Sequence, residues 1–437
     1  MQGSFWLRTL NLVALLAFCA APFVAAEEAQ PQNGHPLGNG NANGNGGEPK
    51  VVAAPAKDPE SEAASRQMPQ YRHPYKDGLY STIVALISFG APDIEKQKKE
   101  KLKVDGFKNT LQIQSIVQPD PAPLVVVLVG LDGKADTPIG RLLPYWLNHA
   151  GYNVLSFDSP FRPSYQEVAR TGVTGNVAVE AADIAKIIDT YVKQPALKGK
   201  FTKIGIVGYS LGATHTVALA RMAADGKLPF ELSGALAFSP PIVLKETAAI
   251  LDGWYSNDRF NYTFVEMGKT FMNHEPVKEG EAIPFKADFM RAGISYEIRE
   301  QFTEIVNNND RVYRLKLIKD EDPGSGEIVN REEEARAWGF KRFFENMSFP
   351  YWKDKAKFKS IDDLWNTADI TQLATKLPEY ARVVVCENDP LNRPEDLELL
   401  KKTIQPKSLV ILPTGGHMGY IGSAWCYHTL VKLFKPN

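Results

Sequence analysis

The chain has 437 residues, of which 44% are hydrophobic and 23% are charged, and its formal net charge is −1. This composition is ordinary for a soluble globular enzyme. With almost no net charge there is no global field to attract nucleic acid or an acidic membrane, so we expect no nucleic-acid partner. The length fits one large α/β domain or two to three average domains.

The N-terminal residues have the pattern of a secretory signal peptide. Arg8 precedes an apolar stretch, Leu10–Ala21, and small residues follow at Val24, Ala25 and Ala26. The stretch is short for a membrane span, so we predict a signal peptide over residues 1–26 and export to the periplasm or the extracellular space. Leu16–Cys19 faintly resembles a bacterial lipoprotein box, but Phe18 stands where that motif needs a small residue, which disfavours lipid anchoring. If the protein associates with a membrane, we expect this N-terminal segment alone to do so.

Residues 27–68 lack a hydrophobic pattern. An Asn/Gly tract is followed by a stretch rich in Pro, Ala, Lys and Glu. Such a segment buries too little apolar surface to offset the entropy lost on ordering it. We therefore predict a disordered tether, which is either a spacer for a catalytic body or a dispensable tail.

A dense run of charge follows the tether. Five lysines between Lys96 and Lys103 are interspersed with or flanked by Glu95, Glu100 and Asp105. Mixed signs at this density are typical of the solvated face of a helix, which is our prediction, with a docking patch as the alternative.

From about Tyr71 the pattern becomes α/β. Alternating or continuous apolar runs predict strands, and longer helix-forming runs lie between them. This alternation implies a doubly wound, mostly parallel sheet covered on both faces. The expected strands are Leu111–Val117, Leu124–Val129, Tyr152–Phe157, Lys203–Val207, Ser233–Phe238, Arg382–Cys386 and Ser408–Leu412, and the expected helices are Thr137–Ala150, Asn176–Val192, Leu211–Ala224, Pro394–Lys402 and Gly422–Phe434.

The alternation breaks between residues 240 and 381, a stretch that holds 21 of the 45 Phe, Trp and Tyr residues. Because it separates two strands of one sheet, we predict a mainly helical cap at 240–381, inserted between core parts at 69–239 and 382–437. A second independent domain is the alternative. The aromatic side chains are expected to pack this region's own core; a lid over an apolar acyl pocket comes next, and a stacking surface for carbohydrate or nucleic acid is less favoured.

Residues 208–212 have the sequence Gly-Tyr-Ser-Leu-Gly and match the pattern G-x-S-x-G. The apolar strand Ile204–Val207 precedes them and a helix-forming run follows, which is the context that a nucleophile elbow requires. Side chains at Gly208 or Gly212 would collide with neighbouring backbone while Ser210 is held in a strained conformation. Ser210 is therefore the predicted nucleophile; a structural serine in a Gly-rich turn is the alternative.

A serine hydroxyl needs a base within hydrogen-bond reach. His417 follows the strand that ends at Leu412, and Gly415 and Gly416 let the loop bend the imidazole back over the sheet. The other histidines lie near the tether, in predicted helices or in the cap: His35, His73, His149, His215, His274 and His428. His417 is therefore the predicted general base.

The base needs a carboxylate that fixes its tautomer and stabilises the imidazolium. Glu387 and Asp389 lie just beyond the strand Arg382–Cys386, at the carboxyl edge of the sheet, where ligand sites gather in open α/β folds. Asp389 is the preferred acid and Glu387 is the alternative.

The oxyanion of an acyl-transfer intermediate needs at least two N–H donors. One is expected from the amide of Leu211, directly after the nucleophile, and the second from Leu131, in the loop after the strand Leu124–Val129. The carboxylate of Asp132 would repel a developing oxyanion, so its side chain is expected to point away.

Together these motifs resemble the α/β-hydrolase superfamily, from about Leu111 to the C-terminus. The elbow, the acid at Asp389 and the Gly-Gly-His at residues 415–417 match that family's pattern in order and spacing. The resemblance implies a doubly wound sheet, a covalent acyl-enzyme and no cofactor. Two residues depart from the pattern: Val129 stands where many members have His in the oxyanion loop, and Cys386 stands where many have Gly before the acid loop.

The predicted activity is hydrolysis of a small-molecule or lipid-like carboxylic ester. An amide or peptide hydrolase, an acyltransferase with the same triad and a non-catalytic binding protein on this fold are the alternatives. The sequence holds no H-E-x-x-H or C-x-x-C pattern, so we expect no protein-built metal site. Without the signal peptide two cysteines remain, Cys386 and Cys426, and these could pair in an oxidising compartment. The oligomeric state is left open.

Overall fold

The computed structural model describes residues 70–88, 90–131, 133–255, 277, 280–319 and 331–434. The signal peptide predicted at 1–26, the tether predicted at 27–68 and the prediction for Asp132 lie outside these residues. In the described ranges, none of the helices is both long and apolar enough to cross a membrane.

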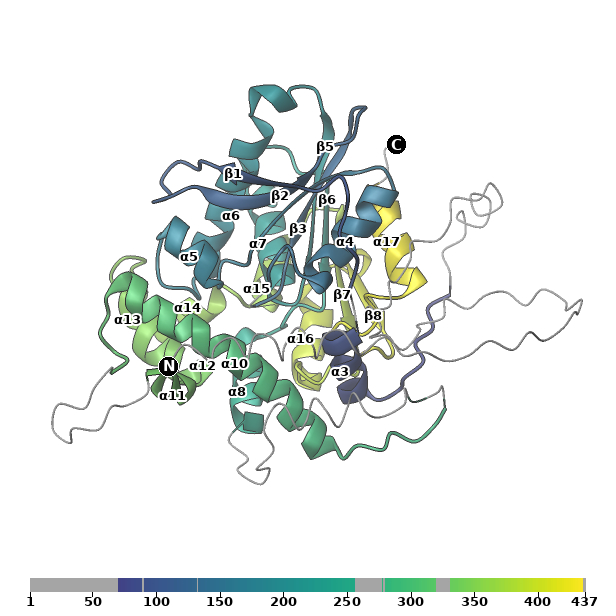
Figure 1. Cartoon of the computed structure of the whole chain (residues 1–437). Coiled ribbons are helices and arrows are strands. Elements are labelled where there is room, and N and C mark those ends of the chain that lie inside the picture. Colours follow the sequence, from purple (N-terminus) through teal and green to yellow (C-terminus); the bar gives the residue numbers. More distant parts are fainter. Residues whose placement is uncertain are drawn as a thin grey trace, which may run out of the picture.

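An eight-stranded sheet forms the centre of the described part (Figure 1). Its strand order is β1-β2-β4-β3-β5-β6-β7-β8. All neighbouring pairs from β4 to β8 are parallel, whereas β2 runs antiparallel to both β1 and β4. The strands are β1 (Lys98–Leu102), β2 (Leu111–Ile116), β3 (Ala122–Leu128), β4 (Asn153–Phe157), β5 (Phe201–Tyr209), β6 (Gly234–Phe238), β7 (Ala381–Cys386) and β8 (Leu409–Leu412). The expected mostly parallel sheet is confirmed.

Strand β1 shows that one prediction is wrong. The lysine-rich run expected as a helix face forms this edge strand, and Leu102 pairs with Leu111 of β2. Its lysine side chains are exposed, while Leu102 and the following Val104 are buried. Lysines on an edge strand keep foreign strands from pairing with its free edge, so a composition that disfavours central strands is tolerated here. Leu102 and Val104 alternate with Lys101, Lys103 and Asp105, and this alternation was the signal for a strand.

Helices cover both faces of the sheet (Figure 1). One face packs against α4 (Pro138–His149) and α17 (Ala424–Phe434). The other face packs against α6 (Val177–Val192), α7 (Leu211–Ala224) and α16 (Pro394–Thr403). The sheet is therefore doubly wound, as expected.

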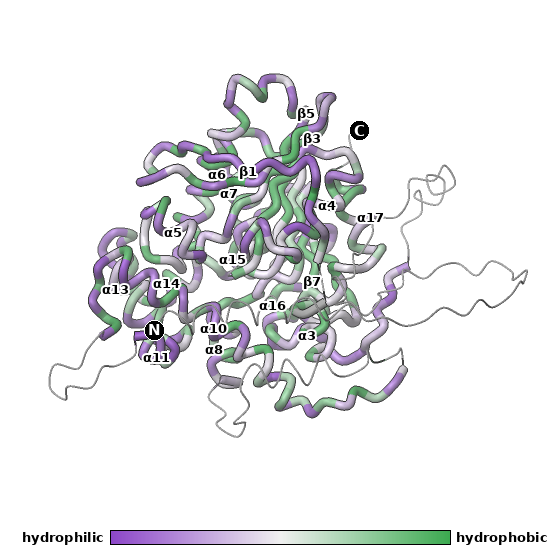
Figure 2. The backbone as a smooth tube through the Cα atoms, viewed as in Figure 1, coloured by the Kyte–Doolittle hydropathy of each residue, from purple (hydrophilic) through white to green (hydrophobic). Residues whose placement is uncertain are grey.

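Strand β3 shows why the central strands are apolar on both sides. Leu124, Val126 and Leu128 pack into the cluster beneath α6 and α7. Val125 and Val127 pack into the cluster beneath α4 and α17. Because burying one such side chain contributes about 1.5–3 kcal/mol, a continuous apolar run is strongly favoured at this place in the sheet. Figure 2 shows the central strands as mostly hydrophobic and β1 as mostly hydrophilic.

The chain between β6 and β7 forms a mainly helical cap at one end of the sheet (Figure 1). Stacked aromatic rings fill its interior: the centroid of Phe302 lies 4.0 Å from that of Phe340, and that of Phe344 lies 3.8 Å from that of Trp365. The described cap helices are α8 (Leu244–Tyr255), α10 (Ala287–Tyr313), α11 (Arg331–Arg336), α12 (Phe340–Phe343), α13 (Phe349–Trp352), α14 (Ile361–Asn366) and α15 (Ile370–Leu373). The predicted helical insertion is thus present in the fold.

A short loop of the core, between α5 (Pro163–Ala169) and α6, holds the cap through hydrogen bonds. The amide of Gly172 donates to the hydroxyl of Tyr313 at 3.1 Å, and the amide of Thr174 donates to Asn309 Oδ1 at 3.1 Å. In return, the indole N–H of Trp352 donates to the carbonyl of Val173 at 2.7 Å. Cap side chains therefore satisfy consecutive buried backbone groups of the core, which fixes the cap on the sheet.

Outside the cap, two helices of the described residues were not predicted from the sequence: α5 and α3 (Gly78–Ser88). Helix α3 precedes β1 in the chain, yet it lies beside the ends of β7 and β8 and packs against α10 of the cap (Figure 1). The strand order, the single antiparallel strand inside the sheet and the helical insertion after β6 together make this an α/β-hydrolase fold.

Candidate active site

Ser210 occupies the sharp turn between β5 and α7. Its backbone has φ 53° and ψ −125°, a region that residues other than glycine rarely adopt and that stores strain. A Cβ atom at Gly208 would lie 2.2 Å from the carbonyl oxygen of Gly212, and one at Gly212 would lie 2.2 Å from the carbonyl oxygen of Leu128. The turn therefore requires both glycines, for the reason expected from the sequence.

The structure brings His417 and Asp389 to Ser210. His417 Nε2 lies 3.0 Å from Ser210 Oγ, and His417 Nδ1 lies 2.9 Å from Asp389 Oδ2. The three side chains come from the loops after β5, β7 and β8, at the carboxyl edge of the sheet. If the carboxylate accepts the Nδ1–H, Nε2 is left free to accept the proton of the serine hydroxyl.

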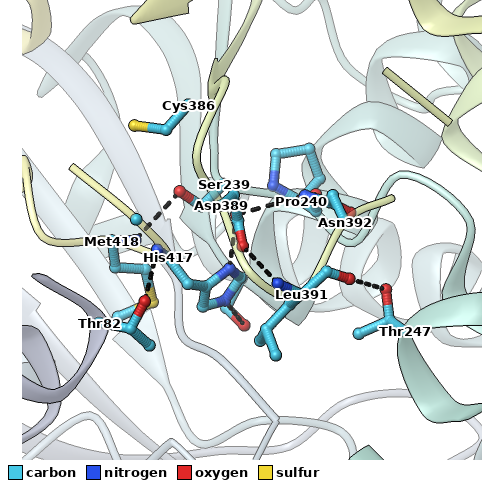
Figure 3. Close-up of polar contacts among 12 residues, drawn as sticks. Thr82, Ser239, Pro240, Thr247, Cys386, Asp389, Leu391, Asn392, His417 and Met418 are labelled. Carbon is cyan, nitrogen blue, oxygen red and sulfur yellow. Dashed lines mark hydrogen bonds and ion pairs between the residues drawn. The ribbon is translucent and has the colours of Figure 1, made fainter. Parts of the chain in front are cut away.

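The side chain of Asp389 is completely buried, and Figure 3 shows its polar contacts. Its Oδ1 accepts a hydrogen bond from the Leu391 amide at 2.9 Å, and its Oδ2 also accepts one from Asn392 Nδ2 at 3.2 Å. Donors aimed at both oxygens fix the orientation of the carboxyl group. Glu387, the alternative acid, is exposed.

Three titratable side chains beside the triad are held neutral. Burial raises the pKa of the Cys386 thiol, and the nearby Asp389 carboxylate raises this pKa further. Burial likewise raises the pKa of Tyr71 and that of Tyr420. These groups add no negative charge at ordinary pH that would compete with Asp389 for the imidazolium.

The residues predicted to supply oxyanion donors lie next to the nucleophile. Leu211 is the first residue of α7, where backbone amides have no acceptor one turn back in the helix. A Cβ atom at Gly130 would lie 3.4 Å from Ser210 Cβ, so the loop that continues into Leu131 lies against the serine.

Apolar side chains from several parts of the chain form one cluster that includes chain neighbours of the triad. A single buried cluster joins Leu211 of the elbow, Leu391 of the acid loop and Phe161 of the core with Tyr80 of α3 and Ile294 of the cap. Each of these side chains is at most 6% exposed. Leu211, directly after the nucleophile, and Leu391, two residues after the acid, thus belong to an apolar cluster that extends into α3 and the cap.

Several features of the described structure lie away from the triad. Two open surface hollows, one beside Phe201 and Lys203 and the other beside Arg221 and Asp225, contain no triad residue. Within the described ranges, no group of three or more His, Cys, Asp or Glu side chains is placed to hold a metal ion. His215, one turn beyond Ser210, is buried and contacts Glu180 at 2.8 Å, which ties α7 to α6.

Sequence reasoning missed the side chains that hold the base loop, residues 413–420. Gly415, Gly416 and Met418 have positive φ angles of 120°, 55° and 70°. Backbone in this conformation does not form a regular ladder, so its buried amides need acceptors from elsewhere. The amide–acceptor pairs are Gly416–Asn388 at 2.9 Å, His417–Thr82 at 2.9 Å and Met418–Ser239 at 3.2 Å (Figure 3 shows the last two). No local motif in the sequence marks these acceptors.

No protein-family model matches this chain, and no curated protein matches its sequence. Solved structures similar to it include an esterase from Pyrococcus furiosus, with 14% identity, a TM-score of 0.43 and coverage of 77% of this chain and 91% of the esterase. A hyperthermophilic esterase from the archaeon Pyrobaculum calidifontis has 15% identity, a TM-score of 0.43 and coverage of 86% and 97%. A carboxyl esterase from Bacillus coagulans has 13% identity, a TM-score of 0.39 and coverage of 78% and 98%. Similarity at this level of identity and TM-score does not show an activity for this chain.

Proposed function

We propose that the protein is a serine hydrolase that cleaves a carboxylic ester, with Ser210 as nucleophile, His417 as general base and Asp389 as the acid that orients the base. The observation that carries this proposal is the continuous hydrogen-bonded chain from Ser210 Oγ to His417 and on to the buried carboxylate of Asp389, with contacts of 3.0 and 2.9 Å. The strained elbow supports it, because strain of this kind is retained where the surrounding structure and a function require it.

The residues would act in a fixed order. His417 Nε2 takes the proton of Ser210 as the serine oxygen attacks the ester carbonyl, and Asp389 stabilises the resulting imidazolium. The amides of Leu211 and Leu131 donate to the oxyanion of the tetrahedral intermediate. The imidazolium then protonates the leaving alcohol, which leaves an acyl group on Ser210. A water molecule, deprotonated by His417, releases the acid and restores the serine.

An ester with an apolar acyl or alcohol part fits the surroundings of the triad best. The cluster that joins the elbow, the acid loop, α3 and the cap is built from aliphatic and aromatic side chains. Burial of an apolar substrate group against such side chains is favourable by about 25 cal/mol per Å². Amide hydrolysis and acyl transfer use the same three residues, so the substrate and the acceptor have to be tested directly.

The first test is labelling by a fluorophosphonate probe together with hydrolysis of p-nitrophenyl esters of increasing chain length. Ser210→Ala is expected to abolish labelling and to lower kcat by about 10⁶-fold, as removal of a triad nucleophile can. Ser233→Ala, at an exposed serine, is the matched control and should behave as the wild type. A wild-type protein that neither reacts with the probe nor hydrolyses the p-nitrophenyl esters would refute the proposal.

We further propose that the protein is exported, on the basis of the sequence of residues 1–26. N-terminal sequencing of the protein from the periplasmic or culture-fluid fraction should find a chain that begins at Glu27. Recovery of an intact Met1 in the cytoplasmic fraction would contradict this proposal.

A further inference from the structure

The described segment that precedes β1, residues 70–88, contacts both loops that carry the proposed base and acid. The hydroxyl of Tyr71 donates to the carbonyl of Thr414 at 2.8 Å, and His73 Nε2 lies 3.2 Å from the carbonyl oxygen of Gly419. These residues are 343 and 346 positions apart in the chain. The start of the folded part is thus packed on the base loop.

Thr82 makes the contact nearest to the chemistry. Its side chain is buried, its hydroxyl donates to the carbonyl of Gly78 at 2.7 Å, and its oxygen accepts from the amide of His417 at 2.9 Å. The first bond uses the only hydroxyl proton, so Oγ1 is left as an acceptor for the histidine amide. Figure 3 shows Thr82 at the backbone of His417, whose ring reaches Asp389.

The beginning of α3 is wedged between the two loops. A Cβ atom at Gly78 would lie 1.9 Å from the carbonyl oxygen of Asn388, and one at Gly416 would lie 2.2 Å from the carbonyl oxygen of Gly78. Asn388 joins the same contact, because its Nδ2 donates to the carbonyl of Lys76 at 2.8 Å while its Oδ1 accepts from the Gly416 amide. Space here is too small for the helix to shift without moving one of the loops.

We propose that Thr82 is a positioning residue for the general base: through its hydroxyl, α3 fixes the backbone of His417 and thereby the position of Nε2 relative to Ser210. This inference rests on the proposed function. Without the hydroxyl, the buried amide of His417 has lost its acceptor, and the loop moves to find another. A displacement of about 1 Å at a reacting group can lower turnover by about 100-fold. Thr82 is buried and bonds to the backbone amide of His417, so we expect its loss to change kcat more than KM.

The test compares Thr82→Val, which keeps the shape and removes the hydroxyl, with Thr82→Ser, which keeps the hydroxyl. Thr82→Val is expected to lower kcat by about 10- to 100-fold with KM changed less than twofold, and to slow fluorophosphonate labelling to the same extent. Thr82→Ser should retain at least half of the wild-type kcat. Ser81→Ala is the matched control. Ser81 is buried in the same helix turn, its hydroxyl donates to the carbonyl of Asp77 and not to the base loop, and alanine keeps the Cβ that packs near Gly419.

Gly78→Ala is an independent variant that decides the matter if Thr82→Val does not fold. Alanine has a higher helix propensity than glycine, so the change does not disfavour the helix itself. Its Cβ would push α3 away from the acid loop, because it would lie 1.9 Å from the carbonyl oxygen of Asn388. A lower kcat with unchanged KM in this variant supports the inference. A wild-type kcat in Thr82→Val, or in Gly78→Ala where Thr82→Val is unfolded, overturns it, as does an equal loss in Ser81→Ala.

Failure of the two proposals is distinguishable. If Ser210→Ala keeps full activity, the proposed function fails and the role of Thr82 fails with it. If Ser210→Ala is inactive while Thr82→Val has the wild-type kcat, the triad stands and the role of Thr82 alone is refuted.

Discussion

Replacement of Asp389 by asparagine tests the triad at its most deeply buried member. The carboxylate accepts three hydrogen bonds: from the Leu391 amide, from Asn392 Nδ2 and from His417 Nδ1. An asparagine side chain has the same shape, but one of its two terminal groups is an NH₂ donor. In one orientation the NH₂ group meets His417 and Asn392, and in the other it meets the amide of Leu391.

Both orientations are unfavourable, and the first disables the base. If the amide oxygen pairs with Leu391, the NH₂ group forces His417 to present Nδ1 as an acceptor, so that its proton moves to Nε2. A protonated Nε2 cannot take the proton of Ser210. The equivalent change in a serine protease lowers kcat by about 10⁴-fold for this reason, and we expect a similar loss here. The buried donor left without an acceptor should also cost about 1–3 kcal/mol of folding stability.

The assay is steady-state hydrolysis of the best p-nitrophenyl ester, with urea unfolding in parallel. Glu387→Gln is the matched control, because Glu387 lies two residues away, has the same kind of charge and is exposed. We expect Glu387→Gln to leave kcat within twofold of the wild type. A kcat for Asp389→Asn above about one tenth of the wild-type value would refute the reasoning, since the imidazole would then be oriented by some other group.

Three further predictions concern packing, pH and redox state. Gly212→Ala should lower the free energy of unfolding by about 1–3 kcal/mol or more, because its Cβ would lie 2.2 Å from the carbonyl oxygen of Leu128; an unchanged urea midpoint would contradict this. Burial lowers the pKa of His73 below its ordinary 6.5, so the unfolded chain binds this proton more readily and stability falls as the pH drops below about 6.5. Melting temperatures at pH 7.5 and 5 should therefore differ less in His73→Asn than in the wild type, and equal differences would count against this account. Cys386 and Cys426 are buried and free, so a reducing agent should leave the melting temperature unchanged; a drop would indicate a disulfide.

Much of the sheet could be predicted because its signals are local. The run Leu124–Val129 is apolar at every position, and the structure places successive side chains of β3 on opposite, equally buried faces. The Gly-Tyr-Ser-Leu-Gly turn could be placed between a strand and a helix because its neighbours on both sides have clear patterns. In both cases the residues that decide the structure are adjacent in the chain.

Helix α3 was not predicted because its residues carry no amphipathic pattern. It is apolar on most of its surface, since it is buried between the cap and the base loop. Its β-branched and aromatic residues favour a strand as much as a helix. The one local signal is Asp77, whose side chain accepts from the amide of Tyr80 at 2.8 Å and so caps the start of the helix.

The same reasoning separates the side chains that would carry the chemistry from those that hold them. Ser210, Asp389 and His417 follow strand ends, so the order of the strands is enough to bring them to one edge of the sheet. The acceptors of the base loop have no such rule, and Thr82 meets His417 across 335 residues. Positive φ angles in the Gly-Gly-His loop turn its amides away from regular pairing, so a loop of this shape has to take its acceptors from other parts of the chain. The position of the base is therefore a property of the whole fold: a chain could keep all three triad side chains and still lose the 3.0 Å contact between His417 and Ser210 through a change at α3.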